Sequence, residues 1–306
     1  MKQGANDLLL KKVLPRWQLY LMMLPALAYL LLFVYKPMYG IIIAFKDYRL
    51  SLGIWNSEWI GFSNFVRLFK SYWFPIIFRN TLIISCLGLI LGFPVGPILA
   101  LMVNEIQNSW IKKTFQTISY APHFISTVVM CGMVILFLSP SGGIINLLRN
   151  TFGLESIFFM QDSDMFKWIY VLSGIWQGMG WSAIIYYAAL ASVDKQIVEA
   201  AKIDGAKRIH IIRHVNLPVL IPTMTILFIL SCGQLLGVGY EKAYLLQNSA
   251  NLSGSEVIST YVYKVGLEKK DFGFSTATGL FNSLINVIIL MIVNQIAKKT
   301  SENSLW

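Results

Sequence analysis

The sequence predicts an all-α integral membrane protein with six transmembrane helices. Hydrophobic residues make up 56% of the 306 residues and charged residues only 13%, whereas a soluble chain carries about 25% charged residues. Six long stretches contain no Asp, Glu, Lys or Arg at all. These stretches are continuously apolar and do not alternate as the strands of a membrane barrel do, so the spanning elements are predicted to be helices.

The six stretches are long enough to cross a bilayer. An α-helix rises 1.5 Å per residue, so about 20 apolar residues span ~30 Å of hydrocarbon. Six such runs in a chain of this size are not expected from the core of a soluble protein. The predicted spans are residues 17–35, 80–104, 114–148, 168–193, 214–240 and 272–297.

The first stretch follows a basic N-terminus that contains Lys2, Lys11, Lys12 and Arg16. This arrangement, with Ala26-Leu27-Ala28 further on, resembles a signal peptide with its cleavage site. The apolar run continues to Tyr35, however, where a cleavage region would turn polar. The sequence therefore predicts an uncleaved first span.

The later stretches contain prolines and glycines, which membrane helices tolerate where they pack together or line a cavity. Among these, Gly178 and Gly180 are expected to allow close helix packing. Three stretches also contain one cysteine each, and the cysteines show no pairing or metal-ligand spacing, so inert buried thiols are expected. No metal site is predicted. The cysteines are Cys86, Cys131 and Cys232.

The orientation follows from the basic residues directly beside the spans. Lys and Arg are divided almost evenly between the two sides, but the basic N-terminus and the Lys298-Lys299 pair lie at the ends of the first and last spans. Basic residues at helix ends favour the cytoplasmic side. The sequence predicts that both termini lie inside the cell.

The loop between the fourth and fifth stretches, residues 194–222, is predicted to contain a short helix over 196–203, a break at Gly205 and a second short helix that ends before Pro218. Ile197, Val198, Ala201, Ile209 and Ile212 can form one apolar stripe on this pair. Such a pair is suited to docking in a groove of a partner, and a position on anionic lipid headgroups is the alternative.

The spacing within this loop carries a resemblance to a known family. Glu199-Ala200-Ala201, three residues, Gly205, nine residues and Val215-Asn216-Leu217-Pro218 resemble the EAA loop of ABC importer permeases of the type I fold. The family pattern is E-A-A-x3-G-x9-I-x-L-P, and the only departure is Val215 in place of Ile. The resemblance implies that this loop couples to a cytoplasmic ATPase, with the coupling residues Glu199, Ala200, Ala201, Asp204, Gly205, Leu217 and Pro218.

The region after the first stretch narrows the resemblance. Residues 37–48 and 59–62, with Asn64-Phe65 and Leu68-Phe69, are similar to the multiple-sugar and polysaccharide (LplB-like) permeases. This implies the import of an oligosaccharide, without indicating which one. It also implies that residues 44–79 face an extracytoplasmic sugar-binding protein.

The resemblance implies the following organisation and partners. Residues 1–75 form an N-terminal tail, first helix and external segment, residues 76–297 form the permease core of five helices, and residues 298–306 form a cytoplasmic tail. The implied partners in the bacterial cytoplasmic membrane are a second homologous permease, membrane lipid, cytoplasmic ATPase subunits and the sugar-binding protein. The chain has no P-loop, so it is expected to bind no cofactor and to be no enzyme, while the ATPase subunits use ATP and Mg²⁺.

Polar and aromatic residues within the spans are candidates for the substrate path. Aromatic rings and hydrogen-bonding side chains bind sugars, and amides that face lipid are costly. The alternatives are interfacial or packing roles for the aromatic residues and helix–helix hydrogen bonds for the amides. The candidates are Trp176, Gln177, Trp181, Tyr187, Gln234, Asn282 and Asn286.

Two other functions stay open at this point. The same importer architecture can carry a different solute, and a secondary transporter would need no ATPase. The second alternative predicts inverted repeats and ionisable residues within the spans, and it leaves the EAA loop unexplained. Nucleic-acid binding has no support once the basic residues are assigned to membrane loops.

Overall fold

The computed structural model describes residues 17–300 and 304–305. The basic residues Lys2, Lys11, Lys12 and Arg16, on which the predicted orientation partly depends, lie outside the described residues. Part of the predicted tail, residues 301–303 and 306, also lies outside them.

The described residues are mostly helical and contain one short two-stranded hairpin. The elements up to residue 151 are α2 (Trp17–Tyr29), the π-helical turn η3 (Leu30–Tyr35), α3 (Lys36–Met38), the 3₁₀ helix η4 (Tyr39–Phe45), β1 (Lys46–Asp47), α4 (Gly53–Asn56), β2 (Glu58–Trp59), α5 (Ser63–Lys70), α6 (Trp73–Leu87), the π-helical turn η5 (Gly88–Gly92), α7 (Val95–Asn104), α8 (Ser109–Tyr120), the 3₁₀ turn η6 (Ala121–Phe124), α9 (Thr127–Phe137) and α10 (Ile144–Thr151). β1 and β2 pair antiparallel, with Lys46 opposite Trp59.

The remaining elements begin at residue 163. They are α11 (Ser163–Ala191), α12 (Lys195–Ile203), α13 (Arg208–Ile211), the π-helical turn η7 (Ile212–Asn216), α14 (Leu217–Cys232), α15 (Tyr240–Leu246), α16 (Leu252–Ser255), α17 (Ile258–Tyr263), the π-helical turn η8 (Lys264–Glu268) and α18 (Phe272–Thr300).

Four helices of the described residues are long and apolar enough to cross a membrane. They are Trp17–Phe45, Trp73–Asn104, Arg208–Cys232 and Phe272–Thr300. The predicted stretches 17–35, 80–104 and 272–297 lie inside three of these helices. The stretch 214–240 overlaps the fourth, which ends earlier, at Cys232.

The third apolar stretch, residues 114–148, is not one continuous helix as predicted. The helical segments Ser109–Phe124 and Thr127–Phe137 meet at an angle of 98°. Pro122 lies in the last turn before the break, and the Ser126 hydroxyl caps α9 by accepting a hydrogen bond from the Val129 N–H at 3.3 Å. A proline and a side-chain cap end one helix and start another even where every residue around them is apolar.

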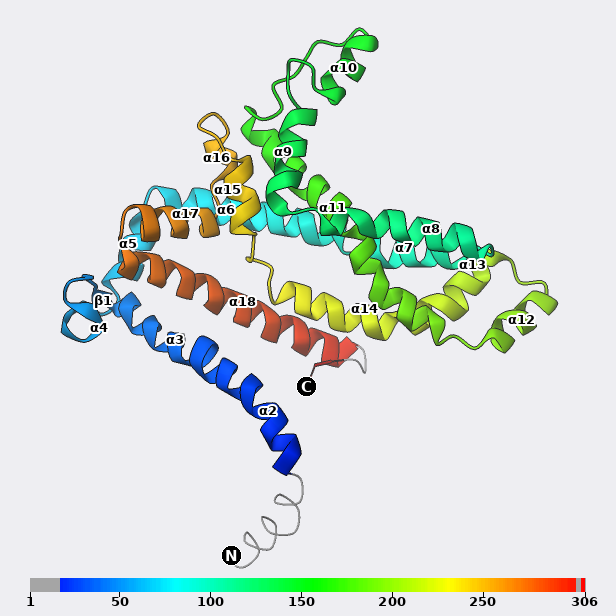
Figure 1. Cartoon of the computed structure of the whole chain (residues 1–306), viewed down its shortest axis with the longest axis horizontal. Coiled ribbons are helices and arrows are strands. Elements are labelled where there is room, and N and C mark those ends of the chain that lie inside the picture. Colours follow the sequence, from blue (N-terminus) through cyan, green and yellow to red (C-terminus); the bar gives the residue numbers. More distant parts are fainter. Residues whose placement is uncertain (1–16, 301–303, 306) are drawn as a thin grey trace, which may run out of the picture.

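The fourth stretch lies in α11, a 29-residue helix at the centre of the molecule. α11 packs against α7, α8, α14 and α6, as Figure 1 shows. Its approach to α8 is close, since a Cβ at Gly180 would lie 2.1 Å from the Ser119 carbonyl oxygen. The expected packing role of Gly180 is thereby confirmed, whereas a Cβ at Gly178 would meet nothing within 4 Å.

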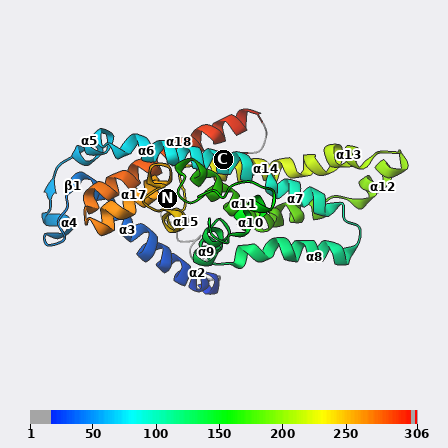
Figure 2. The ribbon, with the colours of Figure 1, turned by 90° about the horizontal axis from the view of Figure 1, so that it is seen from above.

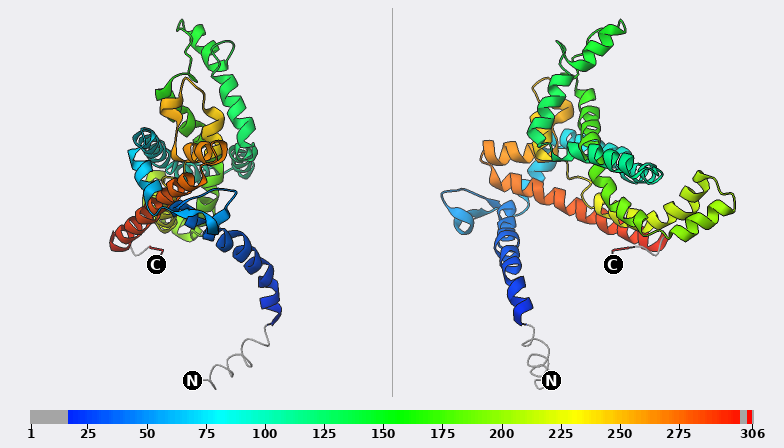
Figure 3. Two further views of the ribbon diagram at one scale, coloured as in Figure 1. Left: turned by 90° about the vertical axis from the view of Figure 1, so that its left-hand side faces the viewer. Right: turned by 45° about the vertical axis from the view of Figure 1, so that its right-hand side comes forward.

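The molecule is elongated, with different loops at its two ends. The hairpin, α4 and α5 lie at one end with the start of α18, and α12 and α13 lie at the opposite end (Figures 1 and 2). α9 and α10 project sideways from this axis, and α2 diverges from the remaining helices (Figure 3). The elongated axis therefore separates the external segment predicted over 44–79 from the 194–222 loop.

Candidate functional site

The 194–222 loop begins with a well-defined helix. Asp194 caps α12 by accepting a hydrogen bond from the Gln196 N–H at 2.9 Å. At the other end Gly205 has φ +78°, the Gly205 N–H binds the Lys202 carbonyl at 3.1 Å, and the Ala206 N–H binds the Ala201 carbonyl at 2.9 Å. This pair of bonds is a Schellman motif, which favours glycine at the left-handed position. The predicted helix over 196–203 and the break at Gly205 are both confirmed.

The second half of the loop differs from the prediction of a short helix ending before Pro218. The helix that starts at Arg208 continues through Leu217 and Pro218 to Cys232. Pro218 lacks an N–H, and its ring would crowd the carbonyl four residues earlier in a regular helix. The wider π-helical turn η7 directly before Leu217 relieves this crowding. The loop is therefore an elbow between α12 and an extension of α14.

The residues assigned to coupling lie largely on the surface of this elbow. Glu199, Ala200, Asp204, Gly205 and Pro218 are exposed, and Ala201 and Leu217 are half-buried. The structure does not give the predicted apolar stripe a uniform burial. Ile197 and Ile209 are exposed, whereas Val198, Ala201 and Ile212 are half-buried. Ile203 is 87% exposed. The elbow thus presents apolar and acidic side chains that this chain itself does not cover.

The candidate amides of the substrate path mostly bind backbone groups at breaks between helices. The Gln177 Nε2 donates to the Ile125 carbonyl at 2.9 Å, beside the 98° bend. The Leu236 backbone accepts from the Asn282 Nδ2 at 3.3 Å and donates to the Asn286 Oδ1 at 2.9 Å. These contacts favour the helix-packing role that was the alternative for such amides.

The candidate aromatic residues do not lie together. Trp176 and Trp181 are exposed, and the Trp181 ring stacks on His123 with ring centroids 4.3 Å apart. Tyr187 is half-buried beside Tyr120, and its hydroxyl has no hydrogen-bond partner among the described residues. None of the three lines the cavities described next.

Two neighbouring cavities lie between α11 and the segment formed by α6 and η5. One, of about 450 Å³, is lined by Gln234 and Ser231, and the other, of about 390 Å³, is lined by Gln177. Both are bordered by Tyr170 and Ser182 of α11. Of the seven predicted path residues, the structure therefore brings Gln177 and Gln234 to these cavities, where they add amide groups to a mainly apolar lining.

Lys242 also lines the smaller cavity and was not among the predicted residues. It lies on α15, outside the four candidate spans, and is only 9% exposed. Its Nζ donates to the Tyr170 carbonyl at 2.6 Å and lies 4.5 Å from the centre of the Tyr170 ring. Burial lowers the pKa of the Lys242 ammonium to about 8. The absence of charge predicted which segments lie in the interior. A lysine just outside such a segment, as Lys242 is, therefore gave no sign in the sequence that it is buried.

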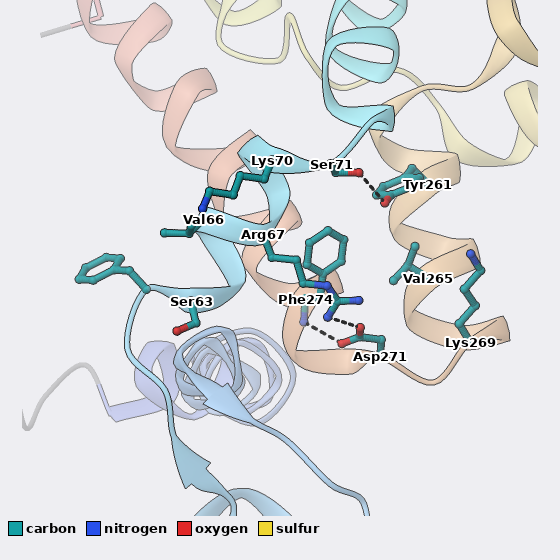
Figure 4. A pocket seen from close by; sticks show the side chains of 11 residues that line it. Ser63, Val66, Arg67, Lys70, Ser71, Tyr261, Val265, Lys269, Asp271 and Phe274 are labelled. Carbon is teal, nitrogen blue, oxygen red and sulfur yellow. Dashed lines mark hydrogen bonds and ion pairs between the residues drawn. The ribbon is translucent and has the colours of Figure 1, made fainter.

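A larger pocket, of about 940 Å³, lies at the end that carries α5 and the start of α18. Arg67 forms an ion pair of 2.7 Å with Asp271 and lies 4.5 Å from the centre of the Phe274 ring. Lys70 and Lys269 also border the pocket, as Figure 4 shows. This end of the molecule therefore presents a predominantly basic hollow.

Long apolar helices, interior cavities and an exposed helical elbow at one end are features of a membrane transport component. Residues 84–302 match the family described as binding-protein-dependent transport system inner membrane component. The chain belongs to this family, and its expected resemblance to ABC importer permeases is confirmed. Members of the family are transport subunits and not enzymes.

Two relatives from Bacillus subtilis (strain 168) match nearly the whole chain. The polygalacturonan/rhamnogalacturonan transport system permease protein YteP is 43% identical over 305 residues, covering 100% of this chain and 95% of the relative. Protein LplB is 40% identical over 291 residues, covering 95% and 91%. The similarity to LplB-like permeases expected from residues 37–69 is thereby confirmed.

Two solved structures share the fold. A chain of a bacterial ABC transporter involved in the import of the acidic polysaccharide alginate has a TM-score of 0.88 at 38% identity, covering 96% of this chain and 99% of the other. A chain of a bacterial alginate ABC transporter in complex with an alginate pentasaccharide-bound periplasmic protein has a TM-score of 0.89 at 37% identity, covering 97% and 100%.

Proposed function

We propose that this chain is the membrane-spanning permease subunit of an ATP-driven, binding-protein-dependent oligosaccharide importer. It forms part of the translocation path and couples to a separate ATPase through the 194–222 loop. The relative named for polygalacturonan/rhamnogalacturonan transport, and the structural neighbours from alginate transporters, support a saccharide substrate.

The observation that carries the coupling role is the exposed elbow at α12. Ile203 is 87% exposed, and Glu199 is exposed and has no partner among the described residues. Neither side chain packs into a core of this chain. The Schellman motif at Gly205 nevertheless holds α12 at a fixed angle to the extension of α14. A rigid elbow continuous with an interior helix can transmit the movement of a docked ATPase to the cavities.

The topology that fits this function has six spans with both termini inside the cell. The four candidate spans, the bent pair of α8 and α9, and α11 supply the six crossings. In this topology, residues 1–75 form the tail, first helix and external segment, residues 76–297 form the permease core and residues 298–306 form the cytoplasmic tail. The membrane is the bacterial inner membrane.

The two ends of the molecule then face different partners. The elbow faces cytoplasmic ATPase subunits, which use ATP and Mg²⁺, and this chain contributes no bond chemistry. The basic hollow around Arg67 faces the extracytoplasmic sugar-binding protein. A second homologous permease completes the path, and lipid covers the remaining apolar helix faces.

The coupling role is tested by reconstituting the complex with its neighbouring subunits and measuring ATP hydrolysis with and without sugar-loaded binding protein. We expect Glu199→Lys to abolish the stimulation, lowering it at least tenfold, because the substitution reverses a charge at the docking surface. The side chain is exposed, so the free energy of unfolding should change by no more than about 0.5 kcal/mol. Glu155→Lys, an equally exposed change outside the elbow, is the matched control.

Three results would contradict the proposal in different ways. Normal stimulation in Glu199→Lys would remove the assigned role of the elbow. A wild-type complex that no saccharide stimulates, but that another solute does, would show that the importer architecture serves a non-sugar substrate. Uptake without any ATPase subunit would favour a secondary transporter.

A further inference from the structure

Lys242 is a buried cation that has no carboxylate beside it in the described part of the chain. Its one hydrogen bond is to the Tyr170 carbonyl, and the ring of the same tyrosine provides a cation–π contact. A lysine ammonium carries three N–H donors, so two of them have no acceptor among the described residues. A buried charge that lacks an opposite charge is costly, and such residues in membrane proteins mark ligand sites.

A second lysine of the same region shows the ordinary arrangement. Lys264 forms an ion pair of 2.5 Å with Glu256, a carboxylate that is 3% exposed, and also donates to the Gln247 amide oxygen. The fold therefore places a carboxylate beside one partly buried lysine of this region and none beside the other. Lys242 borders a cavity, so a negatively charged ligand in that cavity can supply the carboxylate that Lys242 lacks.

The surroundings of the ammonium are shaped to leave that room. A Cβ at Gly174 would lie 2.9 Å from the Lys242 Nζ. Gly88, Gly92 and Gly178 line the same cavity and have no side chains to fill it. Ser182 and Gln177 add hydrogen-bonding groups, and Tyr170 adds an aromatic ring. Hydroxyl, amide and aromatic groups around a cation match a sugar that carries an acidic group.

The chemistry of the relatives points to the same kind of ligand. Polygalacturonan is a polymer of uronic acid units, and alginate is named as an acidic polysaccharide in the transporter that shares the fold. Each unit of such a chain carries a carboxylate, and a buried ammonium in a site of low dielectric discriminates strongly for an anion.

We propose that Lys242 binds a carboxylate of an acidic oligosaccharide in the cavity between α11 and α15, and thereby selects uronate-containing saccharides over neutral ones. Tyr170 positions the ammonium, and Gly174 gives the carboxylate access to it. This inference builds on the proposed importer function and specifies the substrate class that the path accepts.

The test measures direct binding of tetragalacturonate and of its fully methyl-esterified, uncharged form to the purified permease–ATPase complex in detergent, without binding protein. We expect the wild-type complex to bind the acid at least tenfold more tightly than the ester. Lys242→Met should remove this preference, so that both dissociation constants agree within about twofold. Lys242→Arg should retain it.

Two further variants separate recognition from folding. Gly174→Ala adds a methyl group against the ammonium and should reduce the preference for the acid several-fold, which keeps the test decisive if Lys242→Met does not fold. Lys167→Met removes a lysine of α11 that is paired with Asp164 at 3.3 Å and should leave both dissociation constants unchanged.

An unchanged preference for the acid in Lys242→Met and Gly174→Ala would overturn the inference. So would a wild-type complex that binds acid and ester equally, or neither of them. Saccharide-stimulated ATP hydrolysis by the complete wild-type complex is measured in parallel. If that stimulation is present while the preference is absent, the importer function stands and only the role of Lys242 fails.

Discussion

At the scale of single residues, Gly205 shows how a backbone requirement and a surface role coincide. Its φ of +78° lies in the left-handed region, and a Cβ there would meet nothing within 4 Å. A side chain at position 205 would therefore meet no steric clash, and glycine is favoured there only because of the backbone conformation. Side chains other than Asn and Asp adopt that conformation at a cost of roughly 1–2 kcal/mol.

This distinction gives a prediction for the elbow. Gly205→Val should lower binding-protein-stimulated ATP hydrolysis several-fold, because a β-branched residue opposes the left-handed turn and changes the angle of α12. Gly205→Asn should retain most of the stimulation, since asparagine tolerates the same turn. Gly142→Val imposes the same strain at φ +84° in the α9–α10 connection and is the control. Equal losses in the Val and Asn variants at 205 would show that bulk at the docking surface, and not backbone geometry, sets the effect.

At the scale of secondary-structure elements, a polar cluster joins α15, α16, α17 and η8. Glu256 is buried and accepts hydrogen bonds from Gln247 at 3.1 Å and from Thr260 at 3.1 Å, besides its ion pair with Lys264. Short helices of four to seven residues are not stable alone. This cluster therefore holds together the irregular segment between α14 and α18.

Removing its central carboxylate should loosen that segment. We expect Glu256→Ala to destabilise the protein by about 3 kcal/mol, because it leaves Lys264 without its partner. Thermal unfolding in detergent measures the loss. Glu268→Ala removes an exposed carboxylate of the neighbouring turn and should change the midpoint far less. Similar midpoints for the two variants would contradict a stabilising role of the cluster.

The elements also show what the sequence could and could not predict. Absence of charge located the helices around 17–35, 80–104 and 272–297, because lipid excludes charge from a spanning segment. The 98° bend at residues 125–126 and the end of α14 at Cys232 lie within uninterrupted apolar runs, where hydropathy carries no signal. The local sequence pattern of the 194–222 loop did predict the helix over 196–203 and the break at Gly205, since local hydrogen bonds determine both.

The candidate path was harder to predict for a related reason. Amides in apolar helices are easy to find in the sequence. The side chains of Asn282 and Asn286, however, form hydrogen bonds with the backbone of Leu236, a contact between distant segments that the sequence does not reveal. Lys242 was missed because it follows the fifth apolar stretch by two residues and resembles an ordinary loop lysine. Only the packing of α15 against α11 reveals that it is buried.

At the scale of the whole molecule, the separation of the elbow from the hairpin end makes the proposed orientation testable. Ser51→Cys, next to the hairpin, should react with a membrane-impermeant maleimide in intact cells, whereas Lys202→Cys, on α12, should react only after permeabilisation. Both positions are exposed. The native Cys131 and Cys232 are buried and Cys86 is half-buried, so the background should be low. The reverse labelling pattern would invert the topology.

The exposure of α2, the first helix of the described residues, affects which amino-acid replacements it can accept during evolution. None of the thirteen residues of α2 is buried by the rest of this chain. Packing within the subunit therefore places no demand on which apolar side chain stands at each position. Hydrophobicity and length alone keep such a helix in a bilayer. Leu, Ile, Val, Met and Phe should interchange there freely during evolution, whereas the buried face of α11, which includes Phe166, Ala183 and Tyr186, should permit fewer replacements.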